Sequence, residues 1–181
     1  MKNTYILLLC LFLTTLVSGQ ERFLTKTGTI SFFSKLPLEN IQAENSQVLS
    51  IVDATSGQMA IAILMQSFLF EKALMQEHFN ENYVESDKYP KATFKGNIID
   101  FKSIGVVEKK VQVVGMLEIH NESIEITIDA LATKTADTLV MTGAFYINLS
   151  DFAVDIPSIV RNKIAQKIKI SFLFNHKPYK K

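Results

Sequence analysis

A single cysteine limits how this protein can be stabilised. Of the 181 residues only Cys10 is a cysteine, and it lies inside an apolar run near the N-terminus. The rest of the chain therefore forms no internal disulfide and carries out no thiol chemistry. We expect the fold to be held together by a hydrophobic core, for which a chain of this length is sufficient.

A large surplus of charge of either sign is also absent. The chain has 19 Lys and Arg against 18 Asp and Glu. A strongly basic balance would attract nucleic acid or an anionic membrane by charge alone, and this chain lacks one. We expect no nucleic-acid partner. The only basic cluster, Lys177 to Lys181, is interpreted as a solvated terminus.

Motifs for catalysis and metal binding are missing too. The sequence has no Gly-x-Ser-x-Gly elbow, no Gly-rich phosphate loop, no His-x-x-x-His pair and no His-Glu-x-x-His. Glu77, His78 and Glu81 lie close together along a predicted helix, but solvated or capping roles explain them. We predict no enzyme activity, no cofactor and no metal. His176, in the C-terminal tail, is expected to have no role.

The first 19 residues have the pattern of a secretory signal. Lys2 provides the positive charge, residues 6–17 are apolar, and small residues precede a cleavage point after Gly19. The alternative is a transmembrane anchor, but a span needs about 20 apolar residues. Cleavage would remove Cys10 and Lys2, leaving 18 basic residues against 18 acidic ones.

We therefore expect a signal peptide at 1–19 and one domain at 20–181, without a linker or internal repeat between them. The mature domain would be exported and would contain no cysteine. This combination suits a bacterial periplasm better than a eukaryotic extracellular space.

Runs of alternating apolar and polar residues follow one another through this domain. They lie at residues 29–32, 48–52, 59–66, 94–101, 111–119, 124–128, 139–147 and 168–174. Alternation with period 2 predicts strands. The connections are short, which predicts antiparallel order, since parallel crossovers need a dozen residues or more. Eight such strands can form a sandwich or a closed barrel, and an eight-stranded barrel can hold one small or elongated ligand.

Two helical segments interrupt the strands. One is expected near Glu71–Phe79 and the other begins near Pro157, a favourable residue for a first helical turn. Asn121-Glu122 is expected to form a tight hairpin turn, because Asn tolerates a positive φ.

The stretch from Leu74 to Gly96 is the most informative part of the chain. An amphipathic segment runs to Tyr89-Pro90, where proline stops the helix, and Ala92–Lys95 then alternates as a strand does. The sequence Lys88-Tyr89-Pro90-Lys91-Ala92-Thr93-Phe94 resembles the strand entry of the YceI-like family, lipocalin-like polyisoprenoid-binding proteins of bacterial envelopes. Gly115-Met116-Leu117-Glu118-Ile119-His120 and Asp151-Phe152-Ala153-Val154 resemble two later segments of that family, so the resemblance covers nearly all of the mature chain.

This resemblance implies an all-β fold: an eight-stranded antiparallel lipocalin-like β-barrel with one or two short helices. It also implies an exported carrier for an isoprenoid or another long apolar lipid, of the quinone or polyprenyl type. The expected partner is a long-chain isoprenoid or fatty ligand, and transient membrane contact and a homodimer stay open. The alternative function is an envelope protein-interaction module with a filled barrel and no small-molecule ligand.

Apolar side chains are the candidates for lining a tunnel in such a barrel. These are Phe68, Phe70, Leu74, Met75, Phe79, Tyr83, Phe94, Phe145, Phe152 and Phe172. The other interpretation is that they simply fill a core. Small residues such as Gly115 and Gly143 on inward faces would leave room for a cavity, in which a prenyl chain gains free energy by burying apolar area.

The resemblance also implies polar residues on the helical loop at the barrel mouth. The matching candidates for the ligand's head group are His78, Asn80 and Asn82, with Glu77 beside them. Commoner members of the family have an Arg-x-x-Phe-like sequence where Asn80 and Tyr83 fall. Without that arginine a pyrophosphate loses a fixed donor, which leaves a neutral head such as a quinone or an amide as the expected alternative.

Overall fold

Eight long antiparallel strands close on themselves around a common interior. The computed structural model describes residues 21–35, 40–154, 156 and 165–179. A ninth strand, β4 (Leu69–Phe70), is a two-residue addition beside β2. The long strands are β1 (Arg22–Ser34), β2 (Ile41–Asp53), β3 (Gln58–Leu64), β5 (Lys91–Ile98), β6 (Lys109–Ile119), β7 (Glu122–Lys134), β8 (Leu139–Asn148) and β9 (Lys167–Tyr179).

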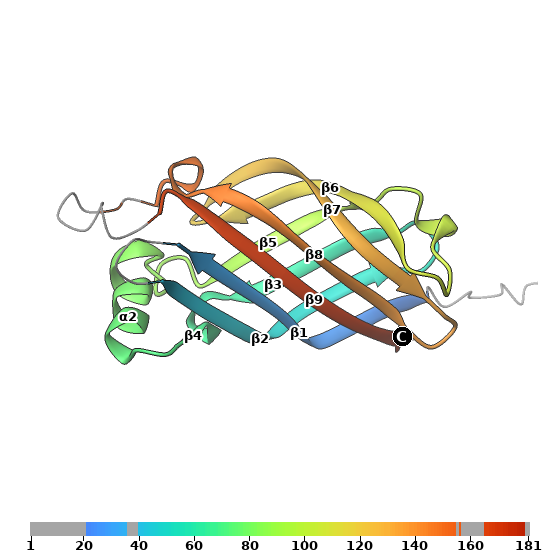
Figure 1. Ribbon diagram of the computed structural model, residues 1–181, viewed down its shortest axis with the longest axis horizontal. Coiled ribbons are helices and arrows are strands. Elements are labelled where there is room, and N and C mark those ends of the chain that lie inside the picture. Colours follow the sequence, from blue (N-terminus) through green and yellow to red (C-terminus); the bar gives the residue numbers. More distant parts are fainter. Residues whose placement is uncertain (1–20, 36–39, 155, 157–164, 180–181) are drawn as a thin grey trace, which may run out of the picture.

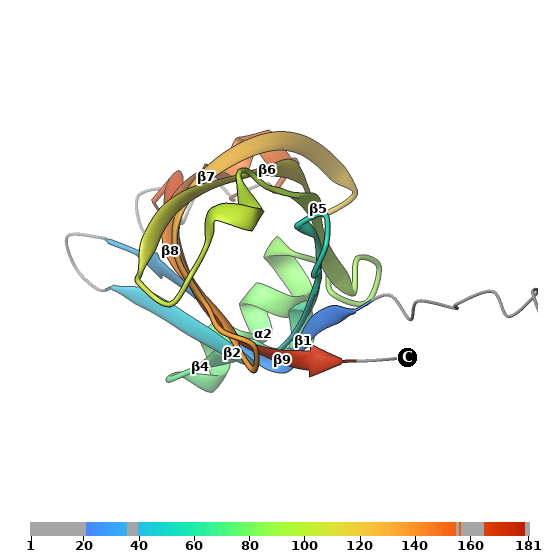
Figure 2. The same ribbon diagram turned by 90° about the vertical axis from the view of Figure 1, so that its right-hand side faces the viewer.

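The strand order shows that the sheet is a barrel and not a sandwich. Neighbouring strands follow the order β1-β9-β8-β7-β6-β5-β3-β2, and β2 then pairs with β1. Seen along the axis, the strands surround one interior, with α2 across the far end (Figure 2). The predicted eight-stranded antiparallel barrel is confirmed. The expected signal peptide and the helix expected from Pro157 lie outside the described residues.

One end of the barrel carries a helical segment and the other end is capped by a loop. The helix α2 (Ala73–His78) continues as the π-helical turn η2 (Phe79–Tyr83), which confirms the helix expected near Glu71–Phe79. It lies beside the end of the barrel opposite to the C-terminus (Figure 1). None of the helices in the described part of the chain is long and apolar enough to cross a membrane.

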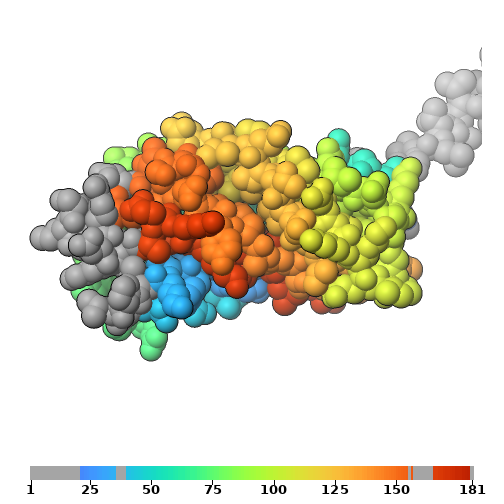
Figure 3. Space-filling model, turned by 45° about the horizontal axis from the view of Figure 1, so that its top comes forward, coloured from blue at the N-terminus to red at the C-terminus, as the bar shows by residue number. Residues whose placement is uncertain are grey.

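The capped end is closed by the connection between β5 and β6. β5 ends at Ile98, so the strand predicted over residues 94–101 is too long, and Phe101 begins the 3-10 helix η3 (Phe101–Ser103) instead. The Phe101 side chain is 3% exposed and packs in the hydrophobic core at this end of the barrel. Figure 3 shows the connection in yellow-green at one end of the molecule.

The hairpin between β6 and β7 turns one residue earlier than predicted. Ile119 pairs with Glu122, so the two turn residues are His120 and Asn121, with φ of 53° and 65°. Two positive φ angles define the turn that matches the twist of antiparallel strands. Asn121 takes the left-handed conformation as expected, but its partner in the turn is His120 and not Glu122.

His176 is a core residue, contrary to the expectation for a tail residue. β9 continues to Tyr179 because it pairs with the start of β1, and His176 is fully buried. Its Nδ1 donates to the carbonyl of Leu139 (2.9 Å), so its Nε2 accepts the hydroxyl of Ser50 (2.8 Å). Burial lowers the pKa of His176 below its ordinary value. The ring is therefore neutral at pH 7.

Candidate ligand-binding site

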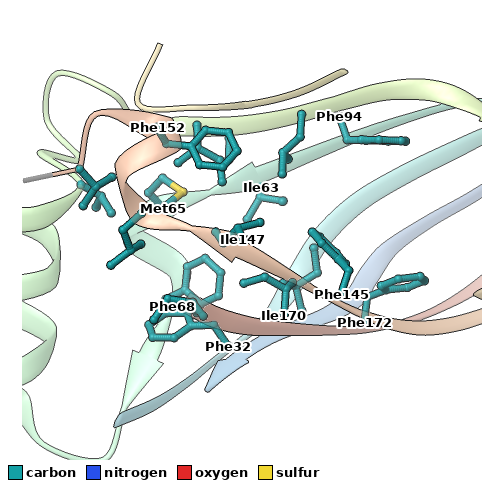
Figure 4. A pocket seen from close by; sticks show the side chains of 18 of the residues that line it. Phe32, Ile63, Met65, Phe68, Phe94, Phe145, Ile147, Phe152, Ile170 and Phe172 are labelled. Carbon is teal, nitrogen blue, oxygen red and sulfur yellow. The ribbon is translucent and has the colours of Figure 1, made fainter. Parts of the chain in front are cut away.

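A cavity of about 310 Å³ lies in the barrel interior and opens toward the helical segment that contains α2. Its wall is made by the inward residues of the strands, because every second side chain of a strand points to the same face. On β3 these are Met59, Ile61 and Ile63. On β9 they include Ile170 and Phe172. In Figure 4 the side chains of Ile63, Phe145 and Ile170 point into this space.

Phenylalanine rings of the cavity wall lie against glycines of the neighbouring strands. A Cβ built on Gly143 would come within 2.6 Å of the Phe172 ring, and one on Gly115 within 2.8 Å of the Phe94 ring. These inward glycines therefore make room for aromatic rings. The sequence predicted that they would leave empty space, which is wrong at these two positions. Phe94 and Phe172 lie toward the end of the cavity away from the helix (Figure 4).

Four phenylalanines hold the helical segment against the barrel at the opposite end. Five ring pairs have centroids between 5.1 and 5.7 Å apart, and they join Phe32 of β1, Phe68, Phe70 of β4 and Phe79 of η2. Such contacts contribute about 0.5–1.5 kcal/mol per pair beyond the area they bury. This cluster joins segments that lie far apart in the sequence and fixes the cavity's rim.

A polar contact ties the segment after η2 to the β6–β7 hairpin. The Nε2 of His120 lies 3.2 Å from a carboxylate oxygen of Glu85, and its ring packs on Tyr89 with centroids 4.1 Å apart. Hydrogen bonds from Lys88 and from His120 hold the pKa of the Glu85 carboxyl below its ordinary value. Together with the phenylalanines, these contacts fix both ends of the helical segment.

Few polar groups reach the cavity. Among the described residues that line it, Ser34, His78 and Tyr83 carry a polar side-chain group, and none carries a formal charge as Asp, Glu, Lys or Arg would. The Ser34 hydroxyl accepts the amide of Ala165 at 3.1 Å. Burial raises the pKa of the Tyr83 hydroxyl, which keeps it protonated.

His78 presents one defined hydrogen-bond donor at the mouth. The side-chain amide of Asn82 donates to Nδ1 of His78 at 2.9 Å. In the neutral ring Nε2 then carries the proton and is available to donate to a ligand. His78 is exposed to solvent and also lines the cavity, so the cavity reaches the surface beside α2.

The structure brings most of the predicted residues together. Those that line the cavity are Phe68, Phe70, Met75, Phe79, Tyr83, Phe94, Phe145, Phe152, Phe172 and His78. Leu74 does not: its side chain is 62% exposed. The adjacent Met75 faces the barrel, and consecutive positions of a helix differ by about 100° in direction, so Leu74 points to solvent. Placing Leu74 on the cavity wall was wrong.

Two of the three polar candidates lie outside the cavity wall. Asn82 does not line the cavity but donates a hydrogen bond to His78, which does. The side-chain oxygen of Asn80 is buried with no hydrogen-bond partner in the described part of the chain. Sequence reasoning also missed inward residues of β1, namely Ile30, Phe32 and Ser34. Their alternation in the sequence could have identified them once the inward face of that strand was known.

A family model describes almost the whole chain. The model of the YceI-like domain matches residues 19–175. Among solved structures, a polyisoprenoid binding domain from Saccharophagus degradans, implicated in plant cell wall breakdown, is similar with 15% identity and a TM-score of 0.76. That match covers 87% of this chain and 98% of the other.

Two further structures have the same fold. BcnA of Burkholderia cenocepacia is 20% identical with a TM-score of 0.70, covering 82% of this chain and 95% of its own. The YCEI protein of Campylobacter jejuni is 19% identical with a TM-score of 0.58, covering 81% and 88%. No curated protein matches. The family model and the barrel agree with the resemblance in the sequence, and this chain belongs to the YceI-like family.

Proposed function

We propose that this protein binds an isoprenoid or a similar long apolar lipid in its barrel and carries it, without covalent chemistry. The observation that carries the proposal is the cavity, which is apolar along its length, closed at one end and accessible beside α2. A hydrocarbon chain placed there would gain about 25 cal/mol for each Å² of apolar surface removed from water. The polyisoprenoid binding described for the similar domain of Saccharophagus degradans supports the same class of ligand.

The polar groups at the mouth favour a neutral head. A charged group buried without a partner is costly, and no described lining residue provides an opposite charge. His78 offers its Nε2–H, and the protonated Tyr83 hydroxyl adds a second donor. A quinone, an alcohol or an amide could accept these hydrogen bonds, whereas a pyrophosphate would find no cation among the described lining residues.

Export to the periplasm, with contact to a membrane, belongs to the same proposal. The N-terminal signal pattern and the lack of cysteine in the mature domain support export. Leu69 and Leu74 are 67% and 62% exposed beside the mouth, where two leucines could touch a lipid surface. Whether the protein forms a homodimer stays open, as in the sequence. The alternative of a protein-interaction module assumed a filled barrel, and the cavity does not favour it.

A matched pair of substitutions on one strand tests the binding site. Ile63 lines the cavity, and its neighbour Leu64 is 45% exposed on the outer face. We expect Ile63→Trp to weaken farnesol binding in calorimetric titrations by about tenfold or more, because the larger ring takes the ligand's space. Leu64→Trp should leave the affinity unchanged. Equal affinity in both variants would contradict binding inside the barrel.

A comparison of two ligands tests the head group. Farnesol and farnesyl pyrophosphate have the same chain, so a difference in affinity reports on the head alone. We expect the alcohol to bind more tightly by about tenfold or more, since the pyrophosphate must be desolvated without a counter-charge from the described lining residues. Tighter binding of the pyrophosphate would contradict the neutral-head proposal.

A further inference from the structure

The cavity does not reach the inward residues at the far end of every strand, and the last lining residue on several strands marks its floor. On β6, Val113 lines the cavity, but the next inward residue, Val111, does not. On β9, Phe174 lines it and His176 does not. Val111 is 5% exposed and His176 is fully buried, so both belong to the buried core below this level.

The rings at the floor are held in position by contacts on both sides. Phe174 stacks on Phe172 with centroids 5.2 Å apart, and it meets the ring of His176 at 5.9 Å. On its other side is Gly28, whose missing side chain leaves room: a Cβ there would lie 2.5 Å from the Phe174 ring. Phe174 is 1% exposed. The floor is thus a packed layer, like the rest of a protein core.

Two measures give the capacity above this floor. From Phe174 to Ile168 the cavity covers six residue steps of β9, which is about 15 Å along the axis at about 3.3 Å per residue and a tilt of about 40°. The volume of about 310 Å³ is roughly twice that of a dry cavity of about 150 Å³ known to hold one benzene, so it has room for about 12 carbon atoms.

We infer that the barrel measures chain length: it encloses about 12 carbons, or two to three isoprene units, between the donors at the mouth and the Phe174 ring at the floor. This inference rests on the proposed function. A longer prenyl chain leaves its remainder outside the barrel, where it gains little. Phe174 and Val113 are the specificity-determining residues, because each ends the cavity on its own strand.

The dissociation constants of the prenols with 5, 10, 15 and 20 carbons test the limit. Each CH₂ that is buried strengthens binding by about fourfold, so affinity should rise steeply as the cavity fills. Between the 15-carbon and the 20-carbon prenol we expect the dissociation constant to change by about threefold or less, since the added isoprene unit stays outside the barrel. A continued steep rise to 20 carbons would overturn the limit and leave the carrier function standing. Failure of every prenol to bind would overturn the proposed function itself.

Two variants should move the limit in opposite directions. Phe174→Ala opens the floor toward Ser50 and His176, so the 20-carbon prenol should gain about tenfold or more over the 15-carbon one. Val113→Phe fills the lower end, so affinity should level off at 10 carbons. Leu173→Ala, on the outer face of β9 and 48% exposed, should leave the limit unchanged. Opposite shifts cannot arise from loss of folding, and an unchanged limit in both variants would overturn the role of the floor.

Discussion

Protonation of one buried histidine should make this protein sensitive to mild acid. His176 is neutral in the folded state, where burial lowers its pKa. In the unfolded chain its pKa is the ordinary value of about 6.5. Below that pH the unfolded chain binds a proton that the folded protein does not, so the free energy of unfolding falls as the pH falls. Above it, the contribution of His176 to stability is fully present.

The expected loss follows from proton linkage alone. If the folded pKa lies below the range tested, the free energy of unfolding drops by about 1.4 kcal/mol at pH 5.5 and about 2 kcal/mol at pH 5.0, relative to pH 7.5. Glu85 and Asp129 also have lowered pKa values, but their ordinary values are 4.5 and 3.8. Their contributions are lost only at lower pH, so neither carboxylate accounts for a loss between pH 7.5 and 5.0, and the His176→Gln variant isolates the part due to His176.

Urea unfolding at several pH values, with two histidine variants, is the assay. His176→Gln removes the titration, while its amide can still donate to Leu139 and accept from Ser50, so the free energy of unfolding should be flat across the window. His78→Gln changes an exposed ring and should retain the wild-type slope. A flat wild-type profile, or the same slope in His176→Gln, would refute the assignment of a neutral buried imidazole.

Three further substitutions test the packing, each with a matched control and with urea unfolding as the measurement. Leu139→Ala removes a fully buried side chain and should cost about 2–5 kcal/mol, whereas Leu131→Ala, 42% exposed, should cost about 0.5 kcal/mol or less. Gly115→Ala places a Cβ 2.4 Å from the Lys95 carbonyl and should destabilise by about 1–3 kcal/mol, while Gly105→Ala, with no atom within 4 Å, should be close to neutral. Asn45→Ala removes a buried side chain that donates to the Leu64 carbonyl and accepts the Gln47 amide, at 2.9 Å each. It should lower the free energy of unfolding by about 1–3 kcal/mol. The control Ser46→Ala changes an exposed position and should lower it by less. A pair in which the buried and control variants lose equal stability would contradict the packing described there.

Local sequence patterns were sufficient to identify the barrel's strands. The alternation at Met59, Ile61 and Ile63 appears in the sequence and persists in β3, because side chains of a strand alternate whatever the strand pairs with. Which set faces inward is not a local property. Only the closed order of the strands shows that these three residues line the cavity and that Ala60 and Ala62 do not.

Long-range contacts account for the sites that sequence reasoning misplaced. Leu74 and Met75 are adjacent and similarly apolar, and their directions depend on how the Phe79 cluster seats the helix on Phe32. His176 precedes a basic tail in the sequence, but pairing of β9 with the start of β1 draws it into the core. Neither contact has a signature within a few residues.

The floor of the cavity was hidden for the same reason. Gly28 and Phe174 are separated by most of the chain, yet the ring lies where a side chain at Gly28 would be. An inward glycine therefore signals either open space or a seat for a ring, and only the partner strand decides between them. Composition alone could support both a filled core and a cavity.

The central claim is that the barrel carries an apolar ligand, and an organic extract of the protein tests it most directly. The protein should be purified without detergent from its native host, and the extract analysed by mass spectrometry. The account predicts an isoprenoid with a neutral head, such as a quinone, at close to one molecule per chain. An empty extract, with no uptake when prenols and quinones are then supplied, would contradict it.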